Sequence, residues 1–287
     1  MKHAYLIIAH NEFDVLKELI KAIDYIDNDI YIHFDKKVAI IPELTTKYSP
    51  IFVIKDRIDV RWGSVSQIKS EYRLFETAYA AETEYSYYHL ISGVHFPLKP
   101  QSEIHSYFNS LNGKSVLSPL PWDIPEIRRK MGQYHFFISG QYSKNKFIRN
   151  INNILWRLCL RIQGNKWMRN SAIIAGKYSN WASISKNDIP LIVKNKKETL
   201  KSFKYTWCAD ELFIPYIFKK EHISFLEQNL LYQVFEKASP KILSNSDYQV
   251  IIESKALFAR KFNKTSMQLL KRIHDSWKNN SLPDTHS

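Results

Sequence analysis

Short apolar runs alternate with amphipathic stretches through the first hundred residues of the chain. The run at 5–9 is continuous, which is typical of a strand buried on both faces. Similar runs at 30–34, 51–54 and 87–91 predict three further strands. Apolar residues at helical spacing predict a helix over 15–23, capped by Asp14, and a longer one over 66–81. The second helix is expected to turn these side chains inward: Tyr72, Leu74, Phe75 and Ala78.

This alternation of strands and helices predicts an α/β fold with a mostly parallel central sheet, right-handed crossovers and flanking helices. Such sheets bind ligands at the carboxyl ends of their strands. The polar residues that follow the predicted strands are His10, Asn11, Asp35, Asp56, Arg57, Ser92 and His95. We expect them to gather along one edge, although each one alone is also compatible with a strand end that turns into solvent.

The rest of the chain is less regular in its middle and ordered again toward its end. A loop-rich basic insertion is predicted at about 120–172, and a short strand at 181–184. Helices are predicted at 189–196, capped by Asn187 or Asp188, at 212–218, and from about Ser246. We interpret 1–278 as a single domain and expect the polar tail, 279–287, to be disordered.

Composition narrows the class of protein. The chain has 287 residues, a formal net charge of +13 and two cysteines, Cys159 and Cys208. No apolar run is long enough to span a bilayer, and two cysteines give neither a disulfide framework nor a metal knuckle, so we expect a cytoplasmic protein. The basic excess suggests a polyanionic partner. The absence of a recognisable nucleic-acid motif argues against nucleic acid.

The segment 145–170 mixes arginines and lysines with tryptophan, leucine and isoleucine. A basic helix of this composition can lie on an anionic bilayer, which would place the protein on the inner face of the cytoplasmic membrane. It can equally be a lid or packing helix whose arginines are solvated.

The acidic pair Asp210–Glu211 is the first candidate for chemistry. Carboxylates are common in the first turn of a helix because they complement its dipole. Here the flanking residues Trp207, Cys208 and Phe213 predict apolar walls around at least one carboxyl. Desolvation raises a carboxyl pKa and makes the group a better base near neutral pH. We therefore predict Glu211 as a general base and Asp210 as a capping or orienting residue.

The pair Arg260–Lys261, between Phe258 and Phe262, is the second candidate. Arginine grips two oxygens and lysine adds a point charge, so the pair suits a diphosphate, although a solvated basic pair is the simpler reading. The chain has no Asp-x-Asp sequence, no His/Cys cluster and no glycine-rich phosphate loop. We therefore expect no metal or cofactor, and assign protein cations, including Lys241, to a leaving diphosphate.

Several stretches then assemble into a known pattern. They are 9–11, 31–37, 61–66, 90–98, 176–181, the pair Asp210–Glu211, 239–243 and 258–262. In this order they resemble the core-2/I-branching β-1,6-N-acetylglucosaminyltransferase family, which also contains the peptide O-xylosyltransferases. The resemblance implies a GT-A-type glycosyltransferase fold and inverting, metal-independent transfer from a UDP-sugar to a glycan or lipid-linked glycan. By the same resemblance, Glu211 is the base, and Arg260 and Lys261 hold the diphosphate.

The resemblance also implies subsites around these residues. The loops at His10, Asp35 and Arg57 would line the uridine pocket. The sugar and acceptor site would be shaped by Trp62, Gly63, Ser92, His95, Trp181 and Asp210. Two positions depart from the family's pattern, since His95 stands where Asp is usual and Asn180 where Gln is usual.

The sequence leaves the donor and the biological setting open. N-acetylglucosamine and xylose are the expected donor sugars, with UDP-galactose or UDP-glucose as alternatives. The absence of a disulfide framework and a membrane anchor suits a bacterial enzyme of surface polysaccharide synthesis. The alternative from another class is a non-enzymatic basic module that binds nucleic acid or anionic membrane.

Overall fold

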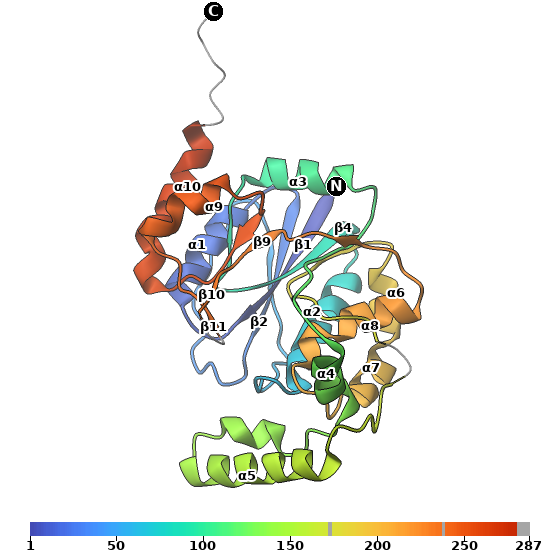
Figure 1. Ribbon diagram of the computed structural model, residues 1–287. Helices are drawn as coiled ribbons and strands as arrows, with labels where there is room; N and C mark the ends of the chain where they lie inside the picture. Colours follow the sequence, from blue (N-terminus) through green and yellow to red (C-terminus); the bar gives the residue numbers. More distant parts are fainter. Residues whose placement is uncertain (172–173, 237–238, 280–287) are drawn as a thin grey trace, which may run out of the picture.

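A seven-stranded sheet forms the centre of the computed structural model, which describes residues 1–171, 174–236 and 239–279 (Figure 1). Its strand order is β3-β2-β1-β4-β7-β6-β8. The strands are β1 (Lys2–Ala9), β2 (Asn28–Phe34), β3 (Ile51–Val53), β4 (Tyr85–Ser92), β6 (Val116–Leu117), β7 (Ser183–Ser185) and β8 (Leu226–Glu227). β3, β2, β1 and β4 run parallel to one another, β7 is antiparallel to both β4 and β6, and β6 is parallel to β8. This is the α/β arrangement that the sequence predicted.

Both faces of the sheet are covered by helices, which explains the continuous apolar run of β1. Tyr5 and Ile7 pack on the side of α1 (Phe13–Ile23), whereas Ala4 and Leu6 pack on the side of α2 (Ser66–Tyr79). The α2 side also carries α6 (Ile189–Lys194), α7 (Lys196–Ser202) and α8 (Phe213–Lys220), as Figure 1 shows. α3 (Gln101–Ser110) contributes Ile104 and Phe108 to the α1 side.

A second, small sheet joins distant parts of the chain beside the large one. Its order is β5-β12-β9, with β5 at Phe96–Pro97, β9 at Leu231–Tyr232 and β12 at Phe258–Ala259. Next to it lie the hairpin β10 (Phe235–Glu236) and β11 (Ser239–Pro240), then α9 (Tyr248–Glu253) and α10 (Met267–Asn279). Leu270 and Ile273 of α10 belong to the same core cluster as Val15 of α1. The arrangement fixes the segment that follows β12, which carries the basic pair.

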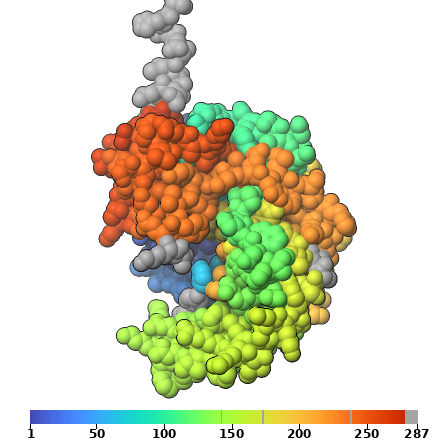
Figure 2. Space-filling view, viewed as in Figure 1, coloured from blue at the N-terminus to red at the C-terminus, as the bar shows by residue number. Residues whose placement is uncertain are grey.

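The segment 120–171 contains α4 (Ile124–Ile127), a π-helical turn at Arg128–Gly132, a 3-10 turn at Ile138–Tyr142 and α5 (Lys146–Gln163). In Figure 1, α5 lies apart from the central sheet, at the lower edge of the molecule. Figure 2 shows the same yellow-green region as a ridge, with blue N-terminal residues visible in the hollow between it and the orange part of the chain.

The predicted strands and the inward face of α2 are confirmed, but several local predictions need correction. Asp14 does not cap α1, because Glu12 holds the N-cap position in a left-handed conformation and makes no side-chain cap. Asp188 holds the N-cap position of α6, but its carboxylate accepts hydrogen bonds from Ser115 and Ser185 instead. The helices α3 and α10 were not predicted. The tail beyond residue 279 lies outside the described residues.

Candidate active site

A cavity of about 390 Å³ opens at the carboxyl ends of β1, β2 and β4. The strand-end residues His10, Asp35 and Ser92 line it, as the parallel topology requires. Residues from much later in the chain complete the wall. The predicted site residues that line the cavity are His10, Asp35, Trp62, Ser92, Trp181, Asp210, Glu211, Arg260 and Lys261. The acidic pair and the basic pair, 50 residues apart in the sequence numbering, therefore share one cavity.

Glu211 is held by a lysine that the sequence analysis did not single out. Cys208 adopts a left-handed conformation with φ of 49°, and the chain then makes the 3-10 turn Ala209–Glu211. Lys130 Nζ donates to Glu211 Oε2 at 2.6 Å and also lies 3.1 Å from Glu126 Oε1. Burial opposes the charge of Lys130, but the two carboxylates raise its pKa above the usual value. The pairing leaves Glu211 Oε1 without a hydrogen bond to the described side chains.

Asp210 is the more deeply buried acid of the pair. Its Oδ2 accepts a hydrogen bond from Gln67 Nε2 at 2.8 Å, and no helix end is capped by this side chain. Burial, followed by the negative charge of Glu211, raises the pKa of Asp210 to about 7. The burial that the sequence predicted for at least one carboxyl therefore belongs to Asp210, while the Glu211 side chain stays 28% exposed.

Gly63 supports this acid pair from behind. It has a φ of +71°, its N–H donates to the Gln67 side chain, and its carbonyl accepts the Cys208 N–H at 3.0 Å. A Cβ at this position would lie 3.0 Å from the Trp207 ring, so the close approach requires glycine. Gly63 does not line the cavity, which corrects its predicted place in the sugar and acceptor site.

The two cations come from the segment after β12. Phe258 and Phe262 are buried on either side of the pair, as predicted. The Arg260 guanidinium lies over the Trp181 ring at 5.1 Å from its centroid. In the described part of the chain, neither Arg260 nor Lys261 forms an ion pair with a carboxylate. Burial lowers the pKa of Arg260 to about 10 despite the charge of Asp210, so the group is a cation at neutral pH.

Lys241 contributes through its backbone rather than its charge. Its ammonium pairs with Asp247 at 2.8 Å and does not line the cavity, although the neighbouring Pro240 does. The Lys241 carbonyl accepts the N–H of Lys261 at 3.4 Å. The charge of Lys241 is therefore matched by Asp247 in this structure, and its predicted role in holding a diphosphate stays a prediction.

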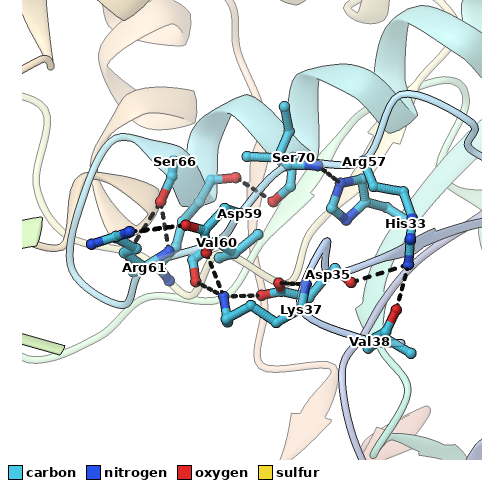
Figure 3. Close-up of polar contacts among 12 residues, drawn as sticks. His33, Asp35, Lys37, Val38, Arg57, Asp59, Val60, Arg61, Ser66 and Ser70 are labelled. Atoms are coloured by element: carbon cyan, nitrogen blue, oxygen red, sulfur yellow. Dashed lines mark hydrogen bonds and ion pairs between the residues drawn. The ribbon is translucent and has the colours of Figure 1, made fainter. Parts of the chain in front are cut away.

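The loop after β2 brings Asp35 to the cavity, whereas Arg57, which follows β3, does not line it. Figure 3 shows Arg57 and Lys37 contacting this loop. The Asp35 carboxylate accepts the Lys37 N–H at 2.9 Å and pairs with Lys37 Nζ at 2.7 Å. Arg57 donates to the carbonyl of Val38 at 2.8 Å, so it braces the loop instead of lining the predicted uridine pocket.

His95 lies behind the cavity wall. Its Nδ1 accepts the Ser92 N–H at 3.0 Å and lies 2.7 Å from Ser92 Oγ, and its ring packs edge-on against Trp181 at 4.9 Å. Burial, together with the charge of Arg260, lowers the pKa of His95 well below its ordinary value. A neutral ring thus stands where the resemblance leads one to expect a carboxylate, and it leaves Arg260 without a counter-charge there.

The sequence analysis assigned no site role to Gln67 and Glu71, which line the cavity, or to Lys130, which holds Glu211. Gln67 and Glu71 are four positions apart on the predicted helix 66–81, so they share a face, which was the signal in the sequence that could have linked them. In the described residues, no three His, Cys, Asp or Glu side chains gather as metal ligands. The expectation of metal independence stays a prediction for experiment.

Comparisons with known proteins agree with the resemblance. The family model for the Core-2/I-Branching enzyme matches residues 3–238. The chain is 25% identical over 118 residues to a mouse N-acetyllactosaminide β-1,6-N-acetylglucosaminyltransferase, covering 39% of this chain and 29% of the mouse protein. It is 27% identical over 119 residues to a human β-1,3-galactosyl-O-glycosyl-glycoprotein β-1,6-N-acetylglucosaminyltransferase, covering 40% and 28%. The chain thus spans less than a third of the length of these relatives.

Mouse xyloside xylosyltransferase 1 is a structural neighbour with a TM-score of 0.45 at 10% identity, covering 92% of this chain and 98% of that one. A TM-score this low carries no argument about function. The family match, in contrast, extends from β1 to the hairpin that precedes the basic pair. The chain therefore belongs to the Core-2/I-branching enzyme family.

Proposed function

We propose that the chain is an inverting, metal-independent glycosyltransferase. It moves N-acetylglucosamine or xylose from a UDP-sugar to a hydroxyl of a glycan or lipid-linked glycan, in a bacterial pathway of surface polysaccharide synthesis. One observation carries the proposal: Glu211 and the cations Arg260 and Lys261, which lack carboxylate partners among the described residues, line the same cavity. An acid without cations would lack a means of holding the leaving group, and cations without an acid would only bind it.

The reaction is a single displacement. Glu211 takes the proton of the acceptor hydroxyl while that oxygen forms a bond to the anomeric carbon. The bond from that carbon to the diphosphate breaks on the opposite face, and UDP leaves with the electron pair. Arg260 and Lys261 stabilise its negative charge. Lys130 fixes Glu211 Oε2 at 2.6 Å and so leaves Oε1 to receive the proton.

The direct test is Glu211→Gln, which keeps the shape of the side chain and removes the base. UDP should bind with unchanged Kd, and kcat should fall by roughly 10²–10⁴-fold. The donor is first identified by thermal shift with UDP-N-acetylglucosamine, UDP-xylose, UDP-galactose and UDP-glucose, since a ligand of the folded state raises Tm. Near-normal turnover of Glu211→Gln would remove Glu211 from the role of base.

A non-enzymatic basic module is the alternative from another class. Non-specific binding to a polyanion weakens steeply as salt rises, because it depends on counterion release. UDP bound in a cavity should persist from 50 to 200 mM salt. Retention on heparin that disappears over this range, together with no thermal shift from any UDP-sugar, would favour the module.

We place the protein in the cytoplasm and assign its membrane contact to α5. Among the described residues, no helix is long and apolar enough to cross a bilayer. α5 contains no acidic residue, and Arg157 and Arg161 are exposed. Large apolar side chains are exposed along the same helix: Phe147 72%, Ile148 45%, Ile151 40%, Ile154 65%, Leu158 51% and Ile162 76%. Such a basic amphipathic helix binds in the headgroup region of anionic bilayers.

Sedimentation with vesicles tests this contact. The protein should bind vesicles that contain phosphatidylglycerol and not pure phosphatidylcholine, and Ile154→Glu/Ile162→Glu should abolish binding. Ile40→Glu is the matched control, because Ile40 is 82% exposed outside α5. If the double variant still binds, α5 is not the contact. If the wild type dimerises and the double variant does not, the apolar surface of α5 is a protein interface instead.

A further inference from the structure

Glu71 is a fully buried carboxyl group in the wall of the cavity. It lies on α2, one turn after Gln67, and its side chain is 0% exposed. Asn180 Nδ2 donates to Glu71 Oε1 at 3.5 Å. Glu71 Oε2 has no hydrogen-bond partner among the described residues. Buried polar atoms in folded proteins are almost always paired, so this oxygen needs an explanation.

The surroundings of Glu71 favour its neutral form. No lysine or arginine among the described residues pairs with it, and an ionised carboxylate without a partner is costly to bury. Burial raises the pKa of Glu71 well above its ordinary value, and the nearby charge of Asp210 adds to the effect. A protonated carboxyl has one O–H donor. Since Oε1 accepts from Asn180, the proton belongs on Oε2.

The neighbouring side chains form a recess that suits a sugar ring. Gln67, Ser70 and Asn180 line the cavity beside Glu71, and Asp210 Oδ1 is a second buried oxygen without a partner among the described residues. Each hydroxyl of a pyranose ring can accept one hydrogen bond and donate another. A ring hydroxyl in this recess would accept from Glu71 and donate to Asp210, and would satisfy both atoms.

We propose that Glu71 binds the sugar, with its protonated Oε2 donating a hydrogen bond to a pyranose hydroxyl of the bound substrate. This inference rests on the proposed glycosyl transfer and deepens it. A pyranose of either the donor or the acceptor has the required chemistry, and the measurements below separate the two sources. The inference assigns Glu71 a role in recognising the sugar and leaves proton removal to Glu211.

Two substitutions test this role. Glu71→Gln keeps an acceptor for Asn180 and a donor in place of Oε2, whereas Glu71→Met keeps the volume and removes both. Both variants should fold, because Glu71 makes a single long hydrogen bond of 3.5 Å, and its partner Asn180 is partly exposed among the described residues. Tm in the absence of ligand checks this directly. Glu71→Met should weaken sugar recognition by about tenfold, and Glu71→Gln should stay within about threefold of the wild type.

The measurements are Kd for UDP, Kd for UDP-N-acetylglucosamine and UDP-xylose, and KM for the acceptor at saturating donor. If the donor sugar is the ligand, Glu71→Met raises Kd for the UDP-sugar and leaves Kd for UDP unchanged. If the acceptor sugar is the ligand, only the acceptor KM rises. A Glu71→Met variant that matches the wild type in every measurement overturns the proposal. If Glu71→Gln is as impaired as Glu71→Met, a neutral side chain that donates a hydrogen bond does not replace Glu71. That result overturns the proposal that a protonated Glu71 is the donor.

Binding and turnover of a UDP-sugar by the wild type separate a failure of the Glu71 proposal from a failure of the proposed glycosyl transfer. If the wild type binds no UDP-sugar, the proposed glycosyl transfer fails. If the wild type binds and turns over a UDP-sugar while Glu71→Met does so equally well, only the role of Glu71 fails. A purely structural role would lower Tm in the absence of ligand and would not separate UDP from UDP-sugar binding.

Discussion

Replacing Lys130 with methionine should slow turnover without weakening nucleotide binding. Methionine fills much of the same volume and removes the ammonium that lies 2.6 Å from Glu211 Oε2 and 3.1 Å from Glu126 Oε1. Removing one partner of a buried ion pair costs about 3–5 kcal/mol. The Glu211 side chain is 28% exposed, and Glu126 keeps Lys177 at 2.8 Å. Solvent screening therefore reduces the expected loss of unfolding free energy to about 1–2 kcal/mol.

The effect of Lys130→Met on turnover follows from the loss of the contact that positions the Glu211 carboxylate. Without Lys130, nothing among the described side chains holds Glu211 Oε2. A misplacement of about 1 Å at a reacting group can cost about 10²-fold in rate. We expect kcat to fall by about 10- to 100-fold, with Kd for UDP unchanged. Steady-state kinetics, titration calorimetry with UDP and urea unfolding measure the three quantities separately.

A double-mutant cycle decides whether Lys130 acts through Glu211. The double variant Lys130→Met/Glu211→Gln should be no slower than Glu211→Gln alone, because the lysine then has no base to position. Lys177→Met is the matched control, since Lys177 pairs with Glu126 and not with Glu211, and it should keep kcat. Full activity in Lys130→Met, or effects that multiply in the double variant, would refute the reasoning.

Three further predictions concern charge. The pKa of Asp210 is raised from 3.8 to about 7, so the folded chain keeps a proton that the unfolded chain releases. The Asp210 carboxyl therefore makes the free energy of unfolding fall as pH rises from about 4 to 7, by up to about 1.4 kcal/mol per pH unit. Asp210→Asn should flatten this slope in urea unfolding at pH 5, 6 and 7, and an unchanged slope would contradict the burial argument. Lys261→Met should raise Kd for UDP by about tenfold, because it removes the proposed charge-assisted contact to phosphate, whereas Lys241→Met should change it by less than about twofold. Equal losses in titration calorimetry would show that the pairing of Lys241 with Asp247 does not withhold its charge from the ligand. EDTA should leave turnover unchanged, because Arg260 and Lys261 are expected to hold the charge of the leaving group, and a strict requirement for manganese in the same assay would contradict this.

Elements that depend on local pattern were predictable from the sequence. The four parallel strands and α2 follow from apolar periodicity, because burial on both faces of a sheet leaves a continuous apolar run. The same topology explains why His10, Asp35 and Ser92 meet at one edge. The helix α3 mixes polar and apolar side chains with little helical periodicity, which made its signal weak. The helix α10 was predictable, because Leu269, Leu270, Ile273 and Trp277 recur at helical spacing, and the sequence analysis missed it.

The contacts that shape the site could not be predicted, since they join residues far apart in the chain. Lys130 and Glu211 are separated by 81 positions, and Gln67 and Asp210 by 143. A motif also says which residue occurs at a position, and not where its side chain points. For this reason four predicted site residues proved to support the cavity from outside its wall: Arg57, Gly63, His95 and Lys241.

The place of β12 in the small sheet also matters while the chain is being made. Every strand of the large sheet precedes residue 228, whereas Arg260 and Lys261 follow β12. At about 5–20 residues per second, the ribosome needs on the order of a few seconds to reach them after β8. During that interval a sugar nucleotide cannot assist the nascent chain, because the charges that would hold it have not yet been synthesised. The large sheet must therefore survive on its own packing until the last part of the site arrives.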